Sequence, residues 1–147
     1  MPSDSSASTA NTEARLLEIV FPDHCNHLGT LFGGQALAWM DKAAFLAASR
    51  YAGCAVVTAR SDRIDFSAPV RLGEIVEVVA KVRSVGRSSI TVRVSLRREA
   101  TPGGEQVEAT TGEFVMVAVD ASGHPLAVAT ARRTSENPEA VVLEEPA

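Results

Sequence analysis

Residues 34–51 read GQALAWMDKAAFLAASRY and predict one long helix. Most of their side chains are strong or fair helix formers, and Gly53 stands where the C-terminus of a helix is expected. Apolar residues occupy almost every face of this predicted helix, so we expect it to be buried on most sides. The fold therefore depends on what the flanking segments place around it.

Five flanking segments have the composition or the alternation of strands: 15–21, 56–66, 74–85, 90–97 and 106–119. In 90–97 every second residue is apolar and the residues between them are polar, which is the period of a half-buried strand. Turn-forming glycines and prolines separate the later segments. One strand, one buried helix and four further strands do not make a βαβ array. The sequence therefore predicts an α+β fold, with an antiparallel five-stranded sheet wrapped around one long central helix.

The length of 147 residues suits one compact domain, and the net charge of -4 is unlike that of a general nucleic-acid binder. Between Arg60 and Glu99, nine basic residues stand against five acidic ones, which favours a local anionic ligand, although a solvated strand face explains the same charges. No apolar run is long and uncharged enough to cross a membrane. The polar N-terminus lacks an export pattern, so we expect a cytoplasmic protein with reduced cysteines.

Asp41 lies on an apolar stripe of the predicted helix. Its neighbours one turn away on the same face are all apolar, and Lys42 at the next position points elsewhere. A carboxylate without a local partner pays a desolvation cost that a structural role rarely justifies. We predict that Asp41 is catalytic. The alternative is an ion pair across the fold with an arginine such as Arg63.

The segment NHLGTLFGG, residues 26–34, runs directly into the predicted helix. Glycines at a helix start let a substrate carbonyl approach free backbone N–H groups, which carry the positive end of the helix dipole. We therefore predict an oxyanion hole and substrate-binding site at Phe32, Gly33 and Gly34. The alternative is a plain turn with an N-terminal cap.

A second glycine turn, Gly86-Arg87-Ser88-Ser89, connects two of the predicted strands. It offers a guanidinium, two hydroxyls and an exposed glycine N–H, which together suit a phosphate group. A solvent-facing turn would have the same spacing.

The segment His24-Cys25-Asn26-His27 raises the alternatives of a metal site and a cysteine nucleophile. Adjacent residues in a turn rarely converge on one metal, and no other His or Cys cluster supplies a fourth ligand, so we predict no metal site. No His–acid arrangement is recognisable around Cys25, which we interpret as a small packing residue.

Several motifs, in their order and spacing, resemble the hot-dog acyl-CoA hydrolases, and the closest group is the YciA-like and brain-type cytosolic acyl-CoA thioesterases. The resemblance covers about 18–119. We therefore divide the chain into a disordered N-terminal tail (1–14), a hot-dog thioesterase domain (15–133) and an acidic C-terminal tail (134–147). The motifs are Asn26-His27-Leu28-Gly29-Thr30-Leu31-Phe32-Gly33-Gly34, Met40-Asp41, Asp65-Phe66-Ser67-Ala68-Pro69, Gly73-Glu74 and Val85-Gly86-Arg87-Ser88-Ser89-Ile90.

The resemblance implies hydrolysis of acyl-CoA without a metal or organic cofactor. It also implies a homodimer whose sheets join edge to edge and which assembles further into a trimer of dimers. The family's helix aspartate falls on Asp41, and its loop asparagine falls on Asn26, from the opposite subunit. We expect Asp41 to act as general base on a water, and the alternative is that it attacks the thioester carbonyl itself. The CoA nucleotide falls near Gly86, Arg87, Ser88 and Ser89. The loop interior departs from the Ala-Asn-Gly-Asp of many relatives, which leaves the acyl-chain preference open.

Two rival functions use the same fold. A hydratase or dehydratase of acyl thioesters uses a His with an acidic partner, and the predicted helix contains no His. A non-catalytic acyl-CoA-binding module of this fold usually carries a DNA-binding domain, for which we expect no room before the first strand. Release of thiol from acyl-CoA would discriminate both rivals from a hydrolase.

Overall fold

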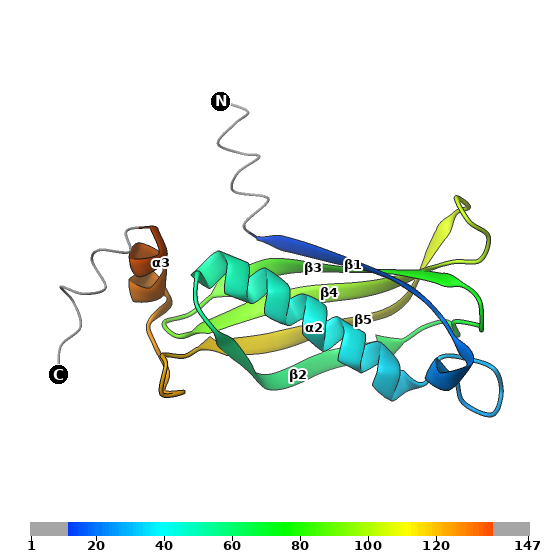
Figure 1. Ribbon diagram of the computed structural model, residues 1–147, viewed down its shortest axis with the longest axis horizontal. Helices are drawn as coiled ribbons and strands as arrows, with labels where there is room; N and C mark the ends of the chain where they lie inside the picture. The colour runs from blue at the N-terminus through cyan, green and yellow to red at the C-terminus, as the bar shows by residue number, and fades with distance from the viewer. Residues whose placement is uncertain (1–11, 137–147) are drawn as a thin grey trace.

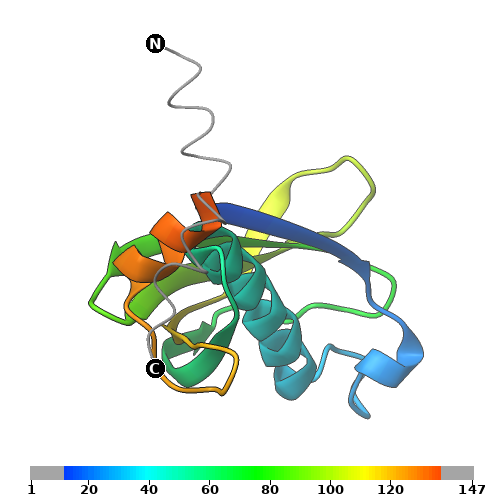
Figure 2. The same cartoon turned by 60° about the vertical axis from the view of Figure 1, so that its left-hand side comes forward.

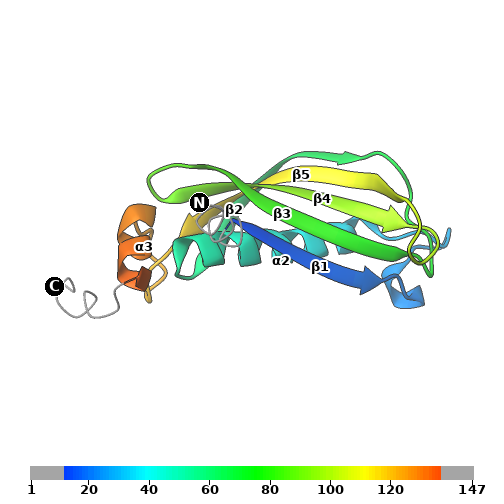
Figure 3. The ribbon, with the colours of Figure 1, turned by 90° about the horizontal axis from the view of Figure 1, so that it is seen from above.

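The computed structural model describes residues 12–136, and its centre is a five-stranded antiparallel sheet. The strands stand in the order β1-β3-β4-β5-β2, and the long helix α2 lies across one face of them (Figure 1). Seen from above, the strands form one curved layer with α2 on its concave side (Figure 3). This arrangement confirms the predicted hot-dog fold. The elements are β1 (Glu13–Ile19), η1 (Pro22–His24), α2 (Gly33–Ala52), β2 (Val56–Phe66), β3 (Ile75–Val85), β4 (Ser89–Glu99), β5 (Gln106–Ala118) and α3 (Val128–Glu136).

Helix α2 is buried along one side, and not on most sides as its composition had predicted, because the apolar Ala38 and Phe45 are exposed. It ends at Gly53, whose φ of 72° and N–H bond to the carbonyl of Ser49 (2.8 Å) form a left-handed C-terminal cap. Its buried side consists mainly of alanines, with Trp39 and Met40 among them. Small side chains let the helix backbone lie close to the sheet, and close packing fixes α2 relative to the strands.

The alternation along the strands determines which face of the sheet α2 covers. On β4, the apolar positions from Ile90 to Leu96 are fully buried. Ion pairs line the strands elsewhere, among them Arg15 with Glu77 at 3.0 Å. The core therefore lies between α2 and the apolar face of the sheet.

Strand β2 forms one edge of the sheet and is exposed along nearly its whole length. It pairs with β5, and no strand within residues 12–136 pairs with its other side. A register shift follows Asp62, and Arg63 within it has a φ of 54°, a left-handed conformation that is uncommon outside glycine and fits a bulge. Val57 and Phe66 are more than half exposed. This edge therefore presents unpaired backbone groups beside large apolar side chains.

Helix α3 is an element that the sequence analysis did not predict. It lies at the C-terminal end of α2 (Figure 2), where the Arg132 guanidinium stands 4.1 Å from the centre of the Tyr51 ring. The Val128 N–H donates to the carbonyl of Arg87 at 2.7 Å, which ties α3 to the turn between β3 and β4. Helix α3 continues past the predicted domain boundary at 133, and β1 begins within the predicted N-terminal tail. The remainder of both predicted tails, 1–11 and 137–147, lies outside the described residues.

Among residues 12–136, no helix combines the length and the apolar character needed to span a membrane.

Candidate active site

Asp41 lies in the middle of α2, half-buried, on the side that faces β2. The Thr58 hydroxyl donates a hydrogen bond of 2.6 Å to Asp41 Oδ1. Neither Arg63 nor any other cation of the described residues forms an ion pair with this carboxylate. One carboxylate oxygen is thus oriented by Thr58, and Oδ2 has no hydrogen-bond partner within residues 12–136. The surrounding cavity of about 310 Å³ is lined by Leu37, Ala38, Asp41, Thr58, Ser61 and Phe114.

Thr58 was not predicted as a site residue. It follows Val56 and Val57 in a strand-like segment, and nothing in that segment marks it as functional. Its importance comes from the pairing of β2 with β5, which places Thr58 opposite Met116 on the side of the sheet that faces α2. The signal is therefore one of strand register, which a single sequence does not display.

Asn26 closes the loop that precedes α2 with its own side chain. Its Oδ1 accepts hydrogen bonds from the N–H groups of Leu28 (2.9 Å) and Thr30 (3.2 Å) and from the Thr30 hydroxyl (3.2 Å). Its backbone N–H donates to the carbonyl of Thr30 at 2.8 Å. Because Oδ1 is committed to the loop, the two N–H donors on Nδ2 are what Asn26 can offer to a ligand.

The start of α2 carries backbone donors at two of the three predicted positions. The first α-helical hydrogen bond runs from the Ala36 N–H to the carbonyl of Phe32 at 3.0 Å, so the N–H groups of Gly33 and Gly34 have no partner within the helix. The Phe32 N–H already donates to the carbonyl of His24 at 3.0 Å. The backbone N–H groups of Gly33 and Gly34 therefore remain available to a ligand, whereas that of Phe32 does not.

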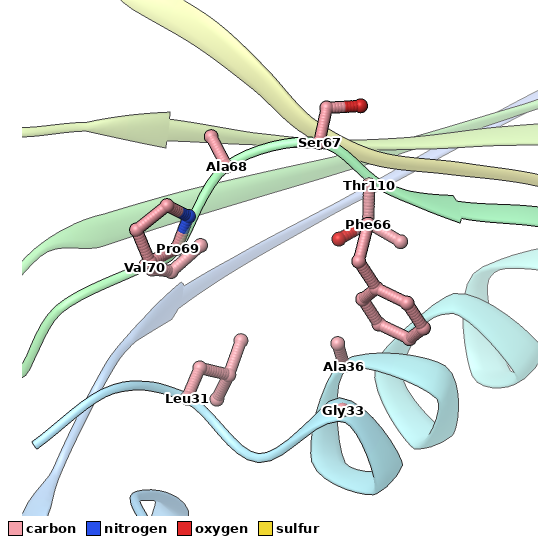
Figure 4. Close-up of a pocket in the computed structure, with 9 residues that line it drawn as sticks. All are labelled: Leu31, Gly33, Ala36, Phe66, Ser67, Ala68, Pro69, Val70 and Thr110. Carbon is pink, nitrogen blue, oxygen red and sulfur yellow. The ribbon is translucent and has the colours of Figure 1, made fainter. Parts of the chain in front are cut away.

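A second cavity, of about 320 Å³, opens beside this helix start (Figure 4). The Phe66 ring points toward the first turn of α2, and a Cβ at Gly33 would come within 3.3 Å of it. Position 33 thus admits a larger residue only if this ring moves. Most of the lining is apolar, and it consists of Leu31, Gly33, Ala36, Phe66, Ser67, Ala68, Pro69, Val70 and Thr110.

The helix start and Asp41 are well separated along α2. At about 1.5 Å per residue, Gly33 and Asp41 lie roughly 12 Å apart along the axis. Asn26 lies near the N-terminus of α2, because a β-bridge between Cys25 and Leu31 closes the loop that contains it just before the helix begins. The chain thus brings Asp41 together with Thr58, and it brings Asn26 to the same end as Gly33 and Gly34. It does not bring these two groups to one point.

The turn Gly86–Ser89 lies at the opposite end of the sheet from the Asn26 loop, beside α3 (Figure 1). The Gly86 N–H donates to the carbonyl of Ser89 at 2.8 Å, so it closes the hairpin and is not the exposed donor that was expected. Arg87 is exposed and has no ion-pair partner among residues 12–136. Ser88 and Ser89 are half-buried. The guanidinium and the hydroxyls are the groups left to contact a ligand.

The histidine and cysteine alternatives have structural explanations. His24 Nδ1 accepts the Phe21 N–H at 3.0 Å, and its ring packs edge-on against Trp39 at 5.0 Å. Cys25 Sγ contacts the carbonyl of Phe21, and burial raises the pKa of the Cys54 thiol, which disfavours a thiolate nucleophile there. Within the described residues, no three His, Cys, Asp or Glu side chains are grouped closely enough to hold a metal ion.

Comparison with known proteins identifies the family. Residues 28–104 match the model of the thioesterase superfamily, which is more than half of the chain. An uncharacterized acyl-CoA thioester hydrolase of Zymomonas mobilis is 35% identical over 79% of this chain and 78% of that protein. The acyl-CoA thioester hydrolase YciA of Salmonella typhimurium is 31% identical over 80% of this chain and 91% of that protein.

Solved structures agree with this assignment. An acyl-CoA hydrolase of Agrobacterium tumefaciens is 50% identical with a TM-score of 0.72 over 78% of this chain, which spans only 45% of that one. The acyl-CoA hydrolase of Staphylococcus aureus, solved with butyryl-CoA, CoA and CoA disulfide, is 29% identical with a TM-score of 0.77 over 93% and 92% of the two chains. A hexameric thioesterase of Yersinia pestis is 32% identical with a TM-score of 0.74 over 80% and 95%.

Three further structures of the S. aureus hydrolase carry a single alanine in place of an asparagine, an aspartate or a threonine. The spacing of those three residues along that chain equals the spacing of Asn26, Asp41 and Thr58 here. The superfamily match and the identity over most of both chains lead to one conclusion: the protein belongs to the thioesterase superfamily and, within it, to the acyl-CoA thioester hydrolases of hot-dog fold.

Proposed function

We propose that the protein hydrolyses acyl-CoA to the free acid and CoA, with Asp41 as general base. The observation that carries the proposal is the Asp41 carboxylate itself, which has no counter-ion within residues 12–136 and is oriented by Thr58 toward a cavity. A water on Oδ2 gives its proton to Asp41 and attacks the thioester carbonyl. The tetrahedral intermediate then expels the CoA thiolate, which takes up that proton. A thiolate leaves readily, so no strong general acid is required.

Each site is proposed to combine two copies of the chain. Asp41 and Thr58 come from one subunit, and Asn26 with the N–H groups of Gly33 and Gly34 comes from the other. The roughly 12 Å between Gly33 and Asp41 along α2 supports this division, because one carbonyl cannot contact both at hydrogen-bond distance. The unpaired edge of β2 offers a place for two sheets to join, and three such dimers would form a hexamer like that of the Yersinia thioesterase.

Asn26 is proposed to act as a donor and not as an acceptor. Its Oδ1 is held by Leu28 and Thr30, so Nδ2 is free to bind the thioester carbonyl or the attacking water. Donors aimed at the developing oxyanion stabilise it.

Asn26→Asp separates the role of the side chain as acceptor within the loop from its proposed role as donor to the substrate. The carboxylate keeps the acceptor for the loop and loses both donors, so we expect a normal melting temperature and a kcat lower by about 10²–10³-fold. Asn26→Ala should lose kcat and also loosen the loop. If Asn26→Asp retained near-normal kcat, the donor role would be wrong. Thiol release and thermal unfolding measure the two effects.

The apolar cavity beside Gly33 is proposed to receive the acyl chain, because it adjoins the N–H groups that would bind the carbonyl. Its volume of about 320 Å³ falls at the small end of ligand pockets. Thiol release from acetyl-, hexanoyl-, palmitoyl- and an aromatic acyl-CoA tests the function and the pocket together. No release from any of them would refute the hydrolase and favour a binding module. Equal rates for all chain lengths would exclude this cavity as the acyl site.

The CoA phosphates are proposed to bind Arg87, Ser88 and Ser89. Arg87 is an exposed cation without an ion pair among the described residues, at the far end of the sheet from the acyl cavity. A nucleotide contact at that distance from the thioester binds the substrate and the transition state equally.

Arg87→Ala should therefore raise KM for acyl-CoA on the order of tenfold, the effect of one charge-assisted hydrogen bond, and leave kcat nearly unchanged. Arg15→Ala serves as the control, since Arg15 is an exposed arginine on the far edge strand β1. A loss in kcat at constant KM would mean that the phosphates bind elsewhere.

A further inference from the structure

Glu74 is a buried carboxylate that the proposed chemistry does not use. It stands just before β3 and is only 8% exposed. Its Oε1 accepts the Arg71 N–H at 3.0 Å, and its Oε2 accepts Arg98 Nη1 at 3.2 Å. A charge is costly to bury unless it is paired and hydrogen-bonded. Glu74 satisfies this requirement by joining the end of β4 to a turn that precedes β3.

That turn is the support on which the Asn26 loop rests. Two backbone hydrogen bonds connect them: the Leu72 N–H donates to the carbonyl of Gly29 at 3.1 Å, and the Leu31 N–H donates to the carbonyl of Val70 at 2.7 Å. Thr30 also forms a β-bridge with Arg71. The residue that Glu74 holds is therefore the residue that pairs with the Asn26 loop.

Thr30 continues the chain of contacts to Asn26. Its N–H and its hydroxyl both donate to Asn26 Oδ1, at 3.2 Å each. Contacts thus run in series from Glu74 to Arg71, from Arg71 to Thr30, and from Thr30 to the Asn26 side chain.

We propose that Glu74 and Arg98 form a positioning pair that fixes the Asn26 amide in the active site through the Arg71–Gly73 turn. The inference rests on the proposed role of Asn26 in the reaction. Misplacement of a catalytic group by about 1 Å costs on the order of 10²-fold in rate, so a pair that does not touch substrate can still determine kcat.

Glu74 is the carboxylate that pairs with Arg98 within residues 12–136, and the Arg98 Nε is buried there without a hydrogen-bond partner. Loss of Glu74 would therefore leave the Arg98 guanidinium without a compensating anion. By contrast, Glu77, which lies within β3, pairs with Arg15 and Gln106 and has no hydrogen bond to the loop or the turn. Glu77 therefore provides a matched control for the loss of a carboxylate from this part of the sheet.

The test uses Glu74→Leu, Glu74→Gln and Glu77→Leu in the full chain. Glu74→Leu removes the acceptor for the Arg71 N–H, and we expect kcat to fall about 10–100-fold with KM within a factor of two. Glu74→Gln keeps an oxygen for that N–H and should retain kcat within about threefold. Glu77→Leu should leave kcat unchanged. If Glu74→Leu fails to fold, Glu74→Leu with Arg98→Met removes both charges and leaves no unpaired cation.

Amide hydrogen exchange gives a second readout that does not depend on activity. The N–H groups of Leu28 and Thr30 should exchange faster in Glu74→Leu and at the normal rate in Glu77→Leu. Unchanged exchange would overturn the positioning pair, whatever the activity. Faster exchange in Glu74→Leu with a normal kcat would also overturn the positioning pair, and it would refute the proposed role of Asn26 as a hydrogen-bond donor in the reaction. A wild-type protein without hydrolase activity would refute the proposed function alone, since the exchange rates would still decide whether Glu74 holds the loop.

Discussion

Replacing Asp41 by Asn is expected to preserve the fold and to lower kcat by about 10²–10⁴-fold, the usual loss when a general base is removed. The substitution changes almost no volume, and the amide oxygen can still accept the Thr58 hydroxyl that now donates to Oδ1. What disappears is the second oxygen as proton acceptor. Thiol release under saturating acyl-CoA measures the loss, and thermal unfolding verifies that the protein is folded.

Asp120→Asn is the matched control for this experiment. Asp120 is an exposed aspartate whose Oδ1 accepts the N–H groups of Ser122 (2.9 Å) and His124 (3.0 Å), and an amide oxygen can replace it there. We expect Asp120→Asn to have the kcat of the unaltered protein. A folded Asp41→Asn variant with comparable turnover would eliminate Asp41 as the base.

Mixing two inactive variants is expected to restore activity from almost nothing to about a quarter of the normal value. Asn26→Ala and Asp41→Ala each remove one half of every site. In an equal mixture, half of the dimers contain one chain of each variant. If each site takes Asn26 from one subunit and Asp41 from the other, such a mixed dimer has one doubly altered site and one intact site. About a quarter of all sites are therefore active. Co-expression followed by thiol release measures the recovery, with mass spectrometry to confirm mixed dimers.

The reverse mixture provides the control. A chain with both substitutions, mixed equally with the unaltered chain, should leave about a quarter of the sites active when sites are shared, and about half when each site lies within one chain. Recovered activity in the mixture of single variants, together with a quarter of normal activity in this control mixture, would support the shared site. No recovery in the first mixture, together with half of normal activity in the control, would place Asn26 and Asp41 in the same subunit. Asp41 would then remain the proposed base.

Local sequence patterns predicted most of the fold. The apolar composition of 34–51 predicted α2 to within one residue at each end, and the alternation of 90–97 predicted the face of β4 that is buried. Both features are local, because helix-forming composition and strand alternation are properties of neighbouring residues in the chain. Helix α3 was missed because its nine residues contain few apolar side chains, and its position depends on contacts with Tyr51 and Arg87.

The candidate site was less predictable, since it depends on contacts between segments that are distant in the chain. Asp41 was recognisable as an uncompensated charge on an apolar helix, and the structure gives it no ion pair within residues 12–136. Thr58 required the register of β2 against β5. The hydrogen bond from the Gly86 N–H to the carbonyl of Ser89 could be predicted only from the conformation of the hairpin. Composition shows which residue types are present, but hydrogen-bond partners are decided only after the strands are paired.

The exposed edge of β2 also bears on how newly made chains avoid aggregation. A long unpaired strand can pair with any other extended segment. The exposed apolar side chains of Val57 and Phe66 would strengthen such an association. Arg60, Asp62 and Arg63 interrupt the strand with charges, and the bulge at Arg63 breaks its regular hydrogen-bonding pattern. These features act as gatekeepers, because a partner strand must match both an alternating charge sequence and an irregular backbone. Substitutions that make β2 straighter and more apolar would therefore lower the yield of soluble protein even where they leave the chemistry of Asp41 untouched.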